Sequence, residues 1–196
     1  IKAIYEKNSG EDPDKDLNVV INEVVASNTL AADENGDKDD YLEIYNNGSQ
    51  AVNIGGWYVS DTPDNPTLYQ IPGTNPALTT IPAKGRLVIW ADGEPLQGIL
   101  HADFKLSKDG EKVTLSRLNY LGELTEVDAV TFPYMEQNMS YSRVPDGSST
   151  WYVTTPTCNL TNGNWSATED IRMTARIYPT LVDNRFTVEN ARAGYV

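Results

Sequence analysis

Residues 41–60, YLEIYNNGSQAVNIGGWYVS, decide the fold class of this chain. Tyr41 to Tyr45 alternates side chains strictly, with Leu42 and Ile44 on one face, and such alternation predicts a half-buried β-strand. Residues 46–49 (NNGS) predict a turn. Residues 52–60 then predict another strand, in which two glycines let the backbone pass close beside Trp57. Two strands joined by a turn within 20 residues indicate antiparallel β-structure.

Outward from this stretch, the chain repeats the same pattern of brief apolar runs separated by turn signals. No segment shows a sustained helical period with caps. Residues 17–26 predict a strand in which every second side chain lies on the same face. Val19, Ile21 and Val25 then share one face, together with Glu23. Residues 62–76 hold four prolines and predict a loop. The pattern predicts an all-β sandwich or barrel, with further strands at residues 17–26, 78–81, 86–90, 104–106, 112–118, 126–132, 139–144 and 151–153.

Composition and charge limit the function of the chain. Its 196 residues include 39% hydrophobic residues, four Trp and eleven Tyr, enough for a packed core. The formal charge of −13 disfavours binding to nucleic acid or to an anionic lipid surface. The sequence contains no apolar run of about 18 residues, so it predicts no membrane-spanning helix. Cys158 is the single cysteine, which excludes a disulfide within the chain.

Several blocks taken together resemble a known family. In order they read VINEVVASN, DKDDYLEIYNNGSQAVNIGGWYVSD, IPAKGRLVIWADG, HADFKLSKDGEKVTLS, VDAVTFP and SYSRVPDGSSTWYVTTPT. This order resembles the bacterial branch of the lamin-tail domain. The resemblance implies an immunoglobulin-like β-sandwich over residues 18–157, after a flexible acidic lead-in at residues 1–17. With the strand pattern, it implies a core that includes Ile44, Trp57, Val88, Leu106, Val113 and Leu115.

The end of the chain has a weaker resemblance. IRMTARIYPTLVDNRFTVENA, which begins at Ile171, is similar to the opening of the sorting domains that Bacteroidetes use in type IX secretion. We therefore expect residues 158–170 to be a linker and residues 171–196 to be a partial sorting domain. A hairpin of this length is marginal alone, so it would dock on the sandwich, pair with another chain, as in a homo-oligomer, or stay mobile.

The acidic stretch DENGDKDD, residues 33–40, is a candidate metal site. Asp33, Asn35, Asp37, Asp39 and Asp40 offer oxygen ligands of the kind that Ca2+ prefers. The stretch lacks the twelve-residue spacing of a helix–loop–helix calcium site and its terminal glutamate. An exposed polar loop remains the alternative.

Catalysis has little support in the sequence. His101 is the only histidine, so a histidine-rich zinc centre cannot form. A set of Ser107, His101 and Asp103 could be assembled, but no nucleophile elbow marks it. A hydrolase that uses paired carboxylates is a further alternative. The sequence predicts a chain that is not an enzyme.

The remaining hypothesis is an interaction or attachment module, secreted or on the outer surface of a cell and part of a larger protein. Its partner is a protein or glycan surface. The alternative is a carbohydrate-binding module that assists a polysaccharide-degrading enzyme. Aromatic side chains that could stack on a ligand are Trp90, Trp151 and Trp165.

Overall fold

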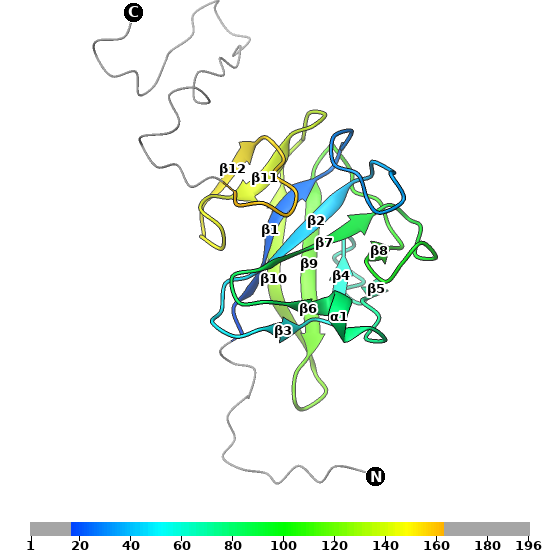
Figure 1. The fold of residues 1–196 in the computed structure, drawn as a ribbon, viewed down its shortest axis with the longest axis vertical. Helices are drawn as coiled ribbons and strands as arrows, with labels where there is room; N and C mark the ends of the chain where they lie inside the picture. Colours follow the sequence, from blue (N-terminus) through cyan, green and yellow to red (C-terminus); the bar gives the residue numbers. More distant parts are fainter. Residues whose placement is uncertain (1–16, 163–196) are drawn as a thin grey trace, which may run out of the picture. The chain divides into compact units, whose positions relative to one another are not determined.

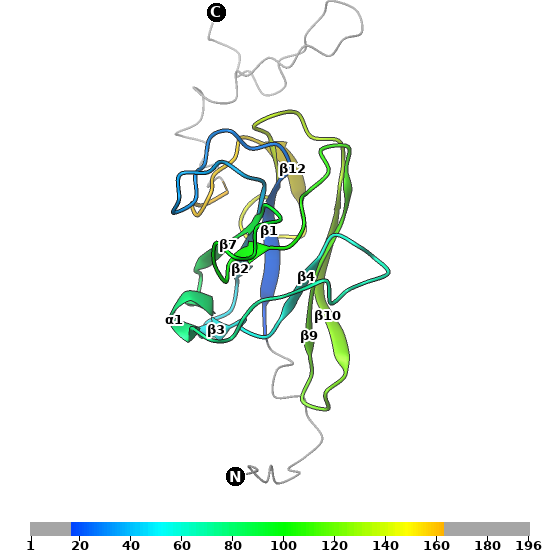
Figure 2. The ribbon, with the colours of Figure 1, turned by 90° about the vertical axis from the view of Figure 1, so that its right-hand side faces the viewer.

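The computed structural model describes residues 17–162, which form two packed β-layers (Figures 1 and 2). One sheet has six strands in the order β12-β11-β1-β2-β7-β8, and the other has four in the order β10-β9-β4-β5. A two-stranded piece, β3-β6, completes the described β-structure. All pairings are antiparallel except β7 with β8. The predicted all-β sandwich is confirmed.

The elements are short, as the frequent turn signals predict. The one helix among the described residues, α1, has four residues, and no helix there is long and apolar enough to cross a membrane. The strands are β1 (Val19–Val25), β2 (Tyr41–Asn46), β3 (Val52–Asn53), β4 (Tyr58–Ser60), β5 (Tyr69–Gln70), β6 (Thr80–Ile81), β7 (Arg86–Ala91), β8 (His101–Ala102), β9 (Glu111–Leu118), β10 (Leu124–Phe132), β11 (Ser140–Arg143) and β12 (Trp151–Thr154), with α1 at Pro76–Thr79.

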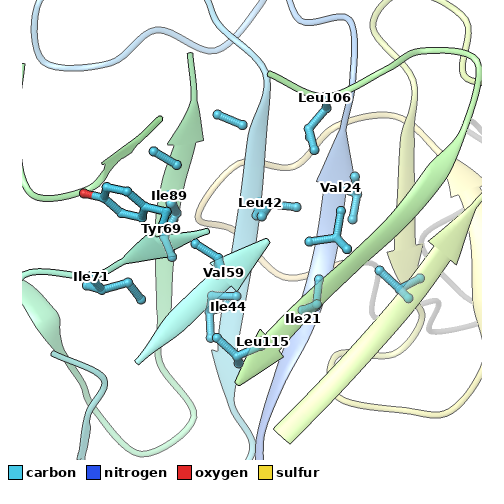
Figure 3. Close-up of a cluster of buried hydrophobic side chains, with 14 of the residues drawn as sticks. Ile21, Val24, Leu42, Ile44, Val59, Tyr69, Ile71, Ile89, Leu106 and Leu115 are labelled. Carbon is cyan, nitrogen blue, oxygen red and sulfur yellow. The ribbon is translucent and has the colours of Figure 1, made fainter. Parts of the chain in front are cut away.

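The core lies between the six-stranded and the four-stranded sheet. Figure 3 shows Ile21, Leu42 and Ile44 meeting Val59 and Leu115 from the opposite layer. All five are fully buried. Of the other residues predicted for the core, Trp57, Leu106 and Val113 belong to it as well. Val88 does not: it is only partly buried and packs on the other face of the large sheet, beside Trp90.

A β-bulge in β1 changes which residues face the core. The pairing of β1 with β2 shifts between Ile21 and Glu23, so the alternation restarts one residue later. Val19, Ile21 and Val24 therefore enter the main core, whereas Val25 packs in a smaller cluster with Tyr41 and Trp90. The prediction that Val25 lies on the same face of the strand as Val19 and Ile21 was wrong. It assumed that successive side chains alternate along the whole strand, and the bulge breaks that alternation.

Residues 52–60 form two strands in different sheets, not the single strand that we predicted. β3 pairs with β6, and β4 pairs with β5 and β9. The chain turns between them at Gly56, whose φ is +90°, in the left-handed region that glycine adopts without strain. A Cβ added to Gly55 would lie 2.9 Å from the Cα of Gly73, so the backbones meet closely before Trp57.

Other expectations differ in detail. Residues 78–81 form the end of α1 and then β6, because the Asn75 side chain caps the helix by accepting from the Ala77 N–H. The predicted loop at residues 62–76 contains β5. Residues 104–106, predicted as a strand, make only an isolated bridge, between Asp92 and Lys105.

A buried ion pair ties the two layers together. Arg143 on β11 donates from Nη2 to both oxygens of Asp128 on β10, at 3.0 Å each. Arg143 Nε also donates to the carbonyl of Ile21, at 2.8 Å, and Asp128 Oδ2 accepts from the Ile21 N–H, at 2.8 Å. One guanidinium and one carboxylate thus connect three strands from the two sheets.

Candidate functional site

The acidic stretch forms a turn at the end of the long β1–β2 connection. Asp33 Oδ1 accepts from the backbone N–H of Asn35, at 2.8 Å, and of Asp37, at 2.9 Å. Burial acts to raise the pKa of Asp33, but these hydrogen bonds outweigh it and lower the pKa. Asn35 donates to Gln97 across the neighbouring loop, at 2.7 Å.

Asp39 and Asp40 have different surroundings from Asp33. Burial raises the pKa of Asp40 to about 6, and its Oδ1 accepts from the Asn28 N–H. Burial also raises the pKa of Asp39, with repulsion from Asp92 as the next cause. Within residues 17–162, no three of the predicted carboxylate ligands have oxygen atoms that all lie within 4.8 Å of one another.

A different group of ligand-type side chains comes together beside this turn. Within residues 17–162, Asp33, Glu34 and His101 are the three His, Cys, Asp or Glu residues whose ligand atoms all lie within 4.8 Å of one another. His101 is fully buried on β8, and its Nδ1 contacts Asp92 Oδ2. Its Nε2 lies 3.3 Å from Glu34 Oε1. Sequence reasoning missed Glu34 and Asp92, and it treated His101 as an isolated residue.

The structure does not assemble the hydrolase set that the sequence left open. His101 pairs with Asp92 and Glu34, whereas the Ser107 hydroxyl accepts from the Asp109 N–H. Asp103 has no contact to His101 among the described hydrogen bonds.

Two of the three aromatic candidates can be placed. Trp90 is 7% exposed and packs edge-on against Tyr41, so its selection as a ligand-stacking residue was wrong. Trp151 is half-buried, stacks on Tyr141 at 5.1 Å and lies under the Arg143 guanidinium at 4.6 Å. Trp165 lies outside the described residues, as does the predicted segment 171–196.

A pair of buried glutamates lies on the outer face of the large sheet. Glu23 and Glu43 are cross-strand partners in β1 and β2, and both are fully buried. Residues 157–162 cover them: Glu23 accepts from the backbone N–H of Thr157 and Cys158, and Glu43 accepts from that of Asn159, at 2.7 Å. The domain therefore extends past residue 157, and the start of the predicted linker is held against the sheet.

The ionisation of Glu43 is strongly perturbed. Burial raises the pKa of Glu43 to about 7, repulsion from Glu23 adds to the rise, and the hydrogen bonds from Asn22 and Asn159 and the charge of Arg86 oppose it. Arg86 Nε lies 3.5 Å from Glu43 Oε1. Burial also raises the pKa of the Cys158 thiol, which disfavours its reactive thiolate.

The β9–β10 hairpin extends beyond the other strands at one end of the sandwich (Figures 1 and 2). Its turn, which we call the hairpin tip (residues 118–124), exposes large apolar side chains to solvent. The exposed fractions are 49% for Leu118, 50% for Tyr120, 61% for Leu121 and 40% for Leu124. The sequence pattern predicts a strand up to Leu118, but it does not mark the LNYLGEL turn as a candidate site.

Two packed, mainly antiparallel sheets make the domain a β-sandwich, the architecture that immunoglobulin-like domains share. The model of the Lamin Tail Domain family matches residues 13–133, well over half of the chain. The chain belongs to the lamin tail domain family. A search of curated proteins and a search of solved structures each found no match.

The part of the chain that matches the family model is shorter than the folded domain. It ends at residue 133, yet β11 pairs with β1 and β12 pairs with β11, so both later strands belong to the large sheet. The predicted type IX sorting resemblance, and with it the Bacteroidetes origin, receives no support from these comparisons.

Proposed function

We propose that this lamin tail domain is a non-catalytic attachment module of a secreted or cell-surface protein, and that its hairpin tip binds a partner protein. The exposed apolar cluster at the tip carries the proposal. Exposed single hydrophobic residues are ordinary, but a contiguous group on a projecting element is typical of an interaction site. Burying the exposed half of such a leucine contributes roughly 0.8–1.5 kcal/mol to binding, half of the value for a fully exposed side chain.

The tip is held in one conformation by its own hydrogen bonds. The Asn119 side chain accepts from the backbone N–H of both Leu121 and Glu123, at 2.9 Å each, and the Asn119 N–H donates to the Glu123 carbonyl. Gly122 takes the left-handed conformation that closes the turn. A turn that is already ordered loses little entropy on binding, which favours affinity.

Charge favours a protein partner over a lipid surface. Glu123 is exposed beside the apolar side chains, and the chain as a whole carries −13, whereas the exposed Glu126 is paired with Lys112. An anionic membrane would repel Glu123 and the net negative charge of the chain. The tip fits an apolar groove with a basic rim on another protein.

The test places a photo-crosslinking residue at position 121 in the full-length protein, identifies the crosslinked partner and measures its affinity in purified form. Leu121→Asp should weaken binding at least roughly tenfold, because it buries a charge in an apolar contact. Leu96→Asp is the matched control, since Leu96 is 100% exposed on a different loop. Equal loss of affinity in both variants, or no loss in either, would refute the docking role of the tip.

The carbohydrate-binding alternative makes a different prediction. It requires an accessible aromatic face, and the partly exposed Trp151 and the exposed Tyr120, Tyr134 and Tyr152 are described residues that could offer one. Glycan-array binding that is lost in Tyr152→Ala and kept in Leu121→Asp would favour that alternative. The location outside the cell is tested separately, by protease or antibody access to the protein on intact cells.

A further inference from the structure

We propose that Asp33, Glu34 and His101 bind a divalent transition metal ion, with Zn2+ as the preferred ion, beside β8. The site is independent of the hairpin tip and of its partner. It replaces the oxygen-only set that the sequence predicts for Ca2+.

The first observation is the position of the three side chains. Their ligand atoms lie within 4.8 Å of one another, although Glu34 and His101 are 67 residues apart in the chain. A tetrahedral Zn2+ ion about 2.0–2.2 Å from each ligand spans this separation after small side-chain movements, and a water would complete the shell.

The second observation concerns His101 itself, which is a fully buried imidazole with a carboxylate at each nitrogen. Carboxylates only accept hydrogen bonds, and a neutral imidazole has a single N–H. With Nδ1–H donating to Asp92, the lone pair of Nε2 points at the oxygen of Glu34. A cation between Nε2 and the carboxylates of Asp33 and Glu34 would give these acceptor atoms a common partner.

The arrangement behind His101 is the one that metal-binding histidines use. A carboxylate on the far ring nitrogen fixes the tautomer and makes the near nitrogen a better ligand. Asp92 is itself held in place: it is 1% exposed and accepts from the Glu94 N–H, at 2.8 Å. Asp92 therefore supplies the outer support behind His101, which is buried, whereas Glu34 is exposed.

The backbone around the cluster is shaped to allow a close approach. A Cβ on Gly98 would lie 3.1 Å from the His101 ring carbon Cδ2 and 3.5 Å from Glu34 Oε1, so a glycine there leaves room for both side chains. The Asn35–Gln97 hydrogen bond joins the turn that carries Asp33 and Glu34 to the loop before β8.

Ligand chemistry decides which ion fits. Ca2+ takes six to eight oxygen ligands, whereas an imidazole nitrogen with two carboxylates suits Zn2+ and its neighbours. Nearby carboxylates give the region negative potential that favours any cation, and repulsion from Asp92, Asp37 and Glu94 acts on Asp39. This negative potential attracts every cation, so it cannot distinguish Zn2+ from Ca2+. The preference for Zn2+ comes from the nitrogen ligand of His101.

The test is metal binding to the full-length protein at pH 7.5 after treatment with a chelator, measured by calorimetry and by thermal unfolding. Zn2+ should bind with one-to-one stoichiometry and, at a hundred times its Kd, raise Tm by roughly 5–10 °C. Glu34→Gln should weaken Zn2+ binding at least roughly tenfold, because a ligand contributes no less than an outer-shell group. This variant should fold normally, since the Glu34 side chain is 65% exposed.

Asp37→Asn is the matched control, because it removes the same charge from an exposed residue of the same turn that lies outside the proposed ligand set. It should keep Zn2+ affinity within about threefold, the range expected for a screened surface charge. An equal loss in Asp37→Asn and Glu34→Gln would show diffuse attraction by acidic residues and overturn the site. Binding of Ca2+ as tight as that of Zn2+ would overturn the role of the nitrogen ligand.

Nitrogen-15 spectra of the imidazole give a direct readout, because His101 is the only histidine. We expect Zn2+ to shift the Nε2 resonance while Nδ1 keeps its proton. A ring that stays doubly protonated and unchanged by Zn2+ would show that Asp92 and Glu34 hold an imidazolium, and the proposal would fail.

Discussion

The buried carboxyl of Glu43 makes the stability of this domain depend on pH in an unusual direction. The pKa of Glu43 is raised from 4.5 to about 7, so folding favours its protonated form. The resulting stabilisation is fully present below pH 4.5 and is lost as the pH rises through 7. The loss from Glu43 alone between pH 5 and pH 8 is about 2.5 kcal/mol, at about 1.4 kcal/mol for each pH unit of unequal proton binding.

The perturbation that tests this is Glu43→Gln, which resembles the protonated carboxyl in shape and charge. The variant should lose less stability than the wild type between pH 5 and pH 8, by about 2.5 kcal/mol. Urea unfolding, followed by tryptophan fluorescence at several pH values, measures the difference. Glu136→Gln is the control, because Glu136 is exposed.

The slopes of stability against pH decide the matter. If Glu43→Gln and wild type show parallel pH profiles, the raised pKa of Glu43 is wrong. If the wild type becomes more stable from pH 5 to pH 8 and the variant does not, the sign is wrong, and the hydrogen bonds from Asn22 and Asn159 and the charge of Arg86 outweigh burial.

Three further predictions follow from single contacts. Asp40→Asn should reduce the loss of stability between pH 5 and pH 8 by about 1.4 kcal/mol in urea unfolding, because burial raises the pKa of Asp40 to about 6. Arg143→Ala should cost roughly 3–5 kcal/mol by the same assay, since it leaves Asp128 charged and largely buried, and a cost below about 1 kcal/mol would contradict the role of this pair. Gly110→Ala should lower Tm by several degrees, because φ is +93° and the new Cβ would lie 2.7 Å from the Phe132 carbonyl oxygen; an unchanged Tm would refute that strain.

Alternation of apolar and polar side chains identified the strands correctly where the strand has no bulge, because the pattern then depends only on neighbouring residues. Leu42 and Ile44 face the core and Glu43 faces away because the bulge lies in β1, whereas β2 itself pairs with β7 in an unbroken register. The same counting failed in β1, where the bulge after Ile21 moves Val24 into the core. A bulge depends on how β1 pairs with β2, and one strand's sequence does not contain that pairing.

The candidate sites were less predictable than the strands. The sequence marked residues 33–40 as acidic, but it could not bring His101 to Glu34, because the two belong to loops that meet only in the fold. Trp90 was wrongly selected for the converse reason. Its residue type suits ligand binding, but in the fold it packs against Tyr41 and is buried.

The amino-acid sequence alone determined the all-β class, the number of short extended segments to within a few, and the acidic character of the surface. These follow from side-chain period and composition, which are properties of neighbouring residues. Tertiary structure alone decided the sheet order, the burial of Glu23 and Glu43, the group around His101 and the exposure of the hairpin tip. Each of these depends on contacts between distant residues, where burial and local charge, and not residue type, set the chemistry.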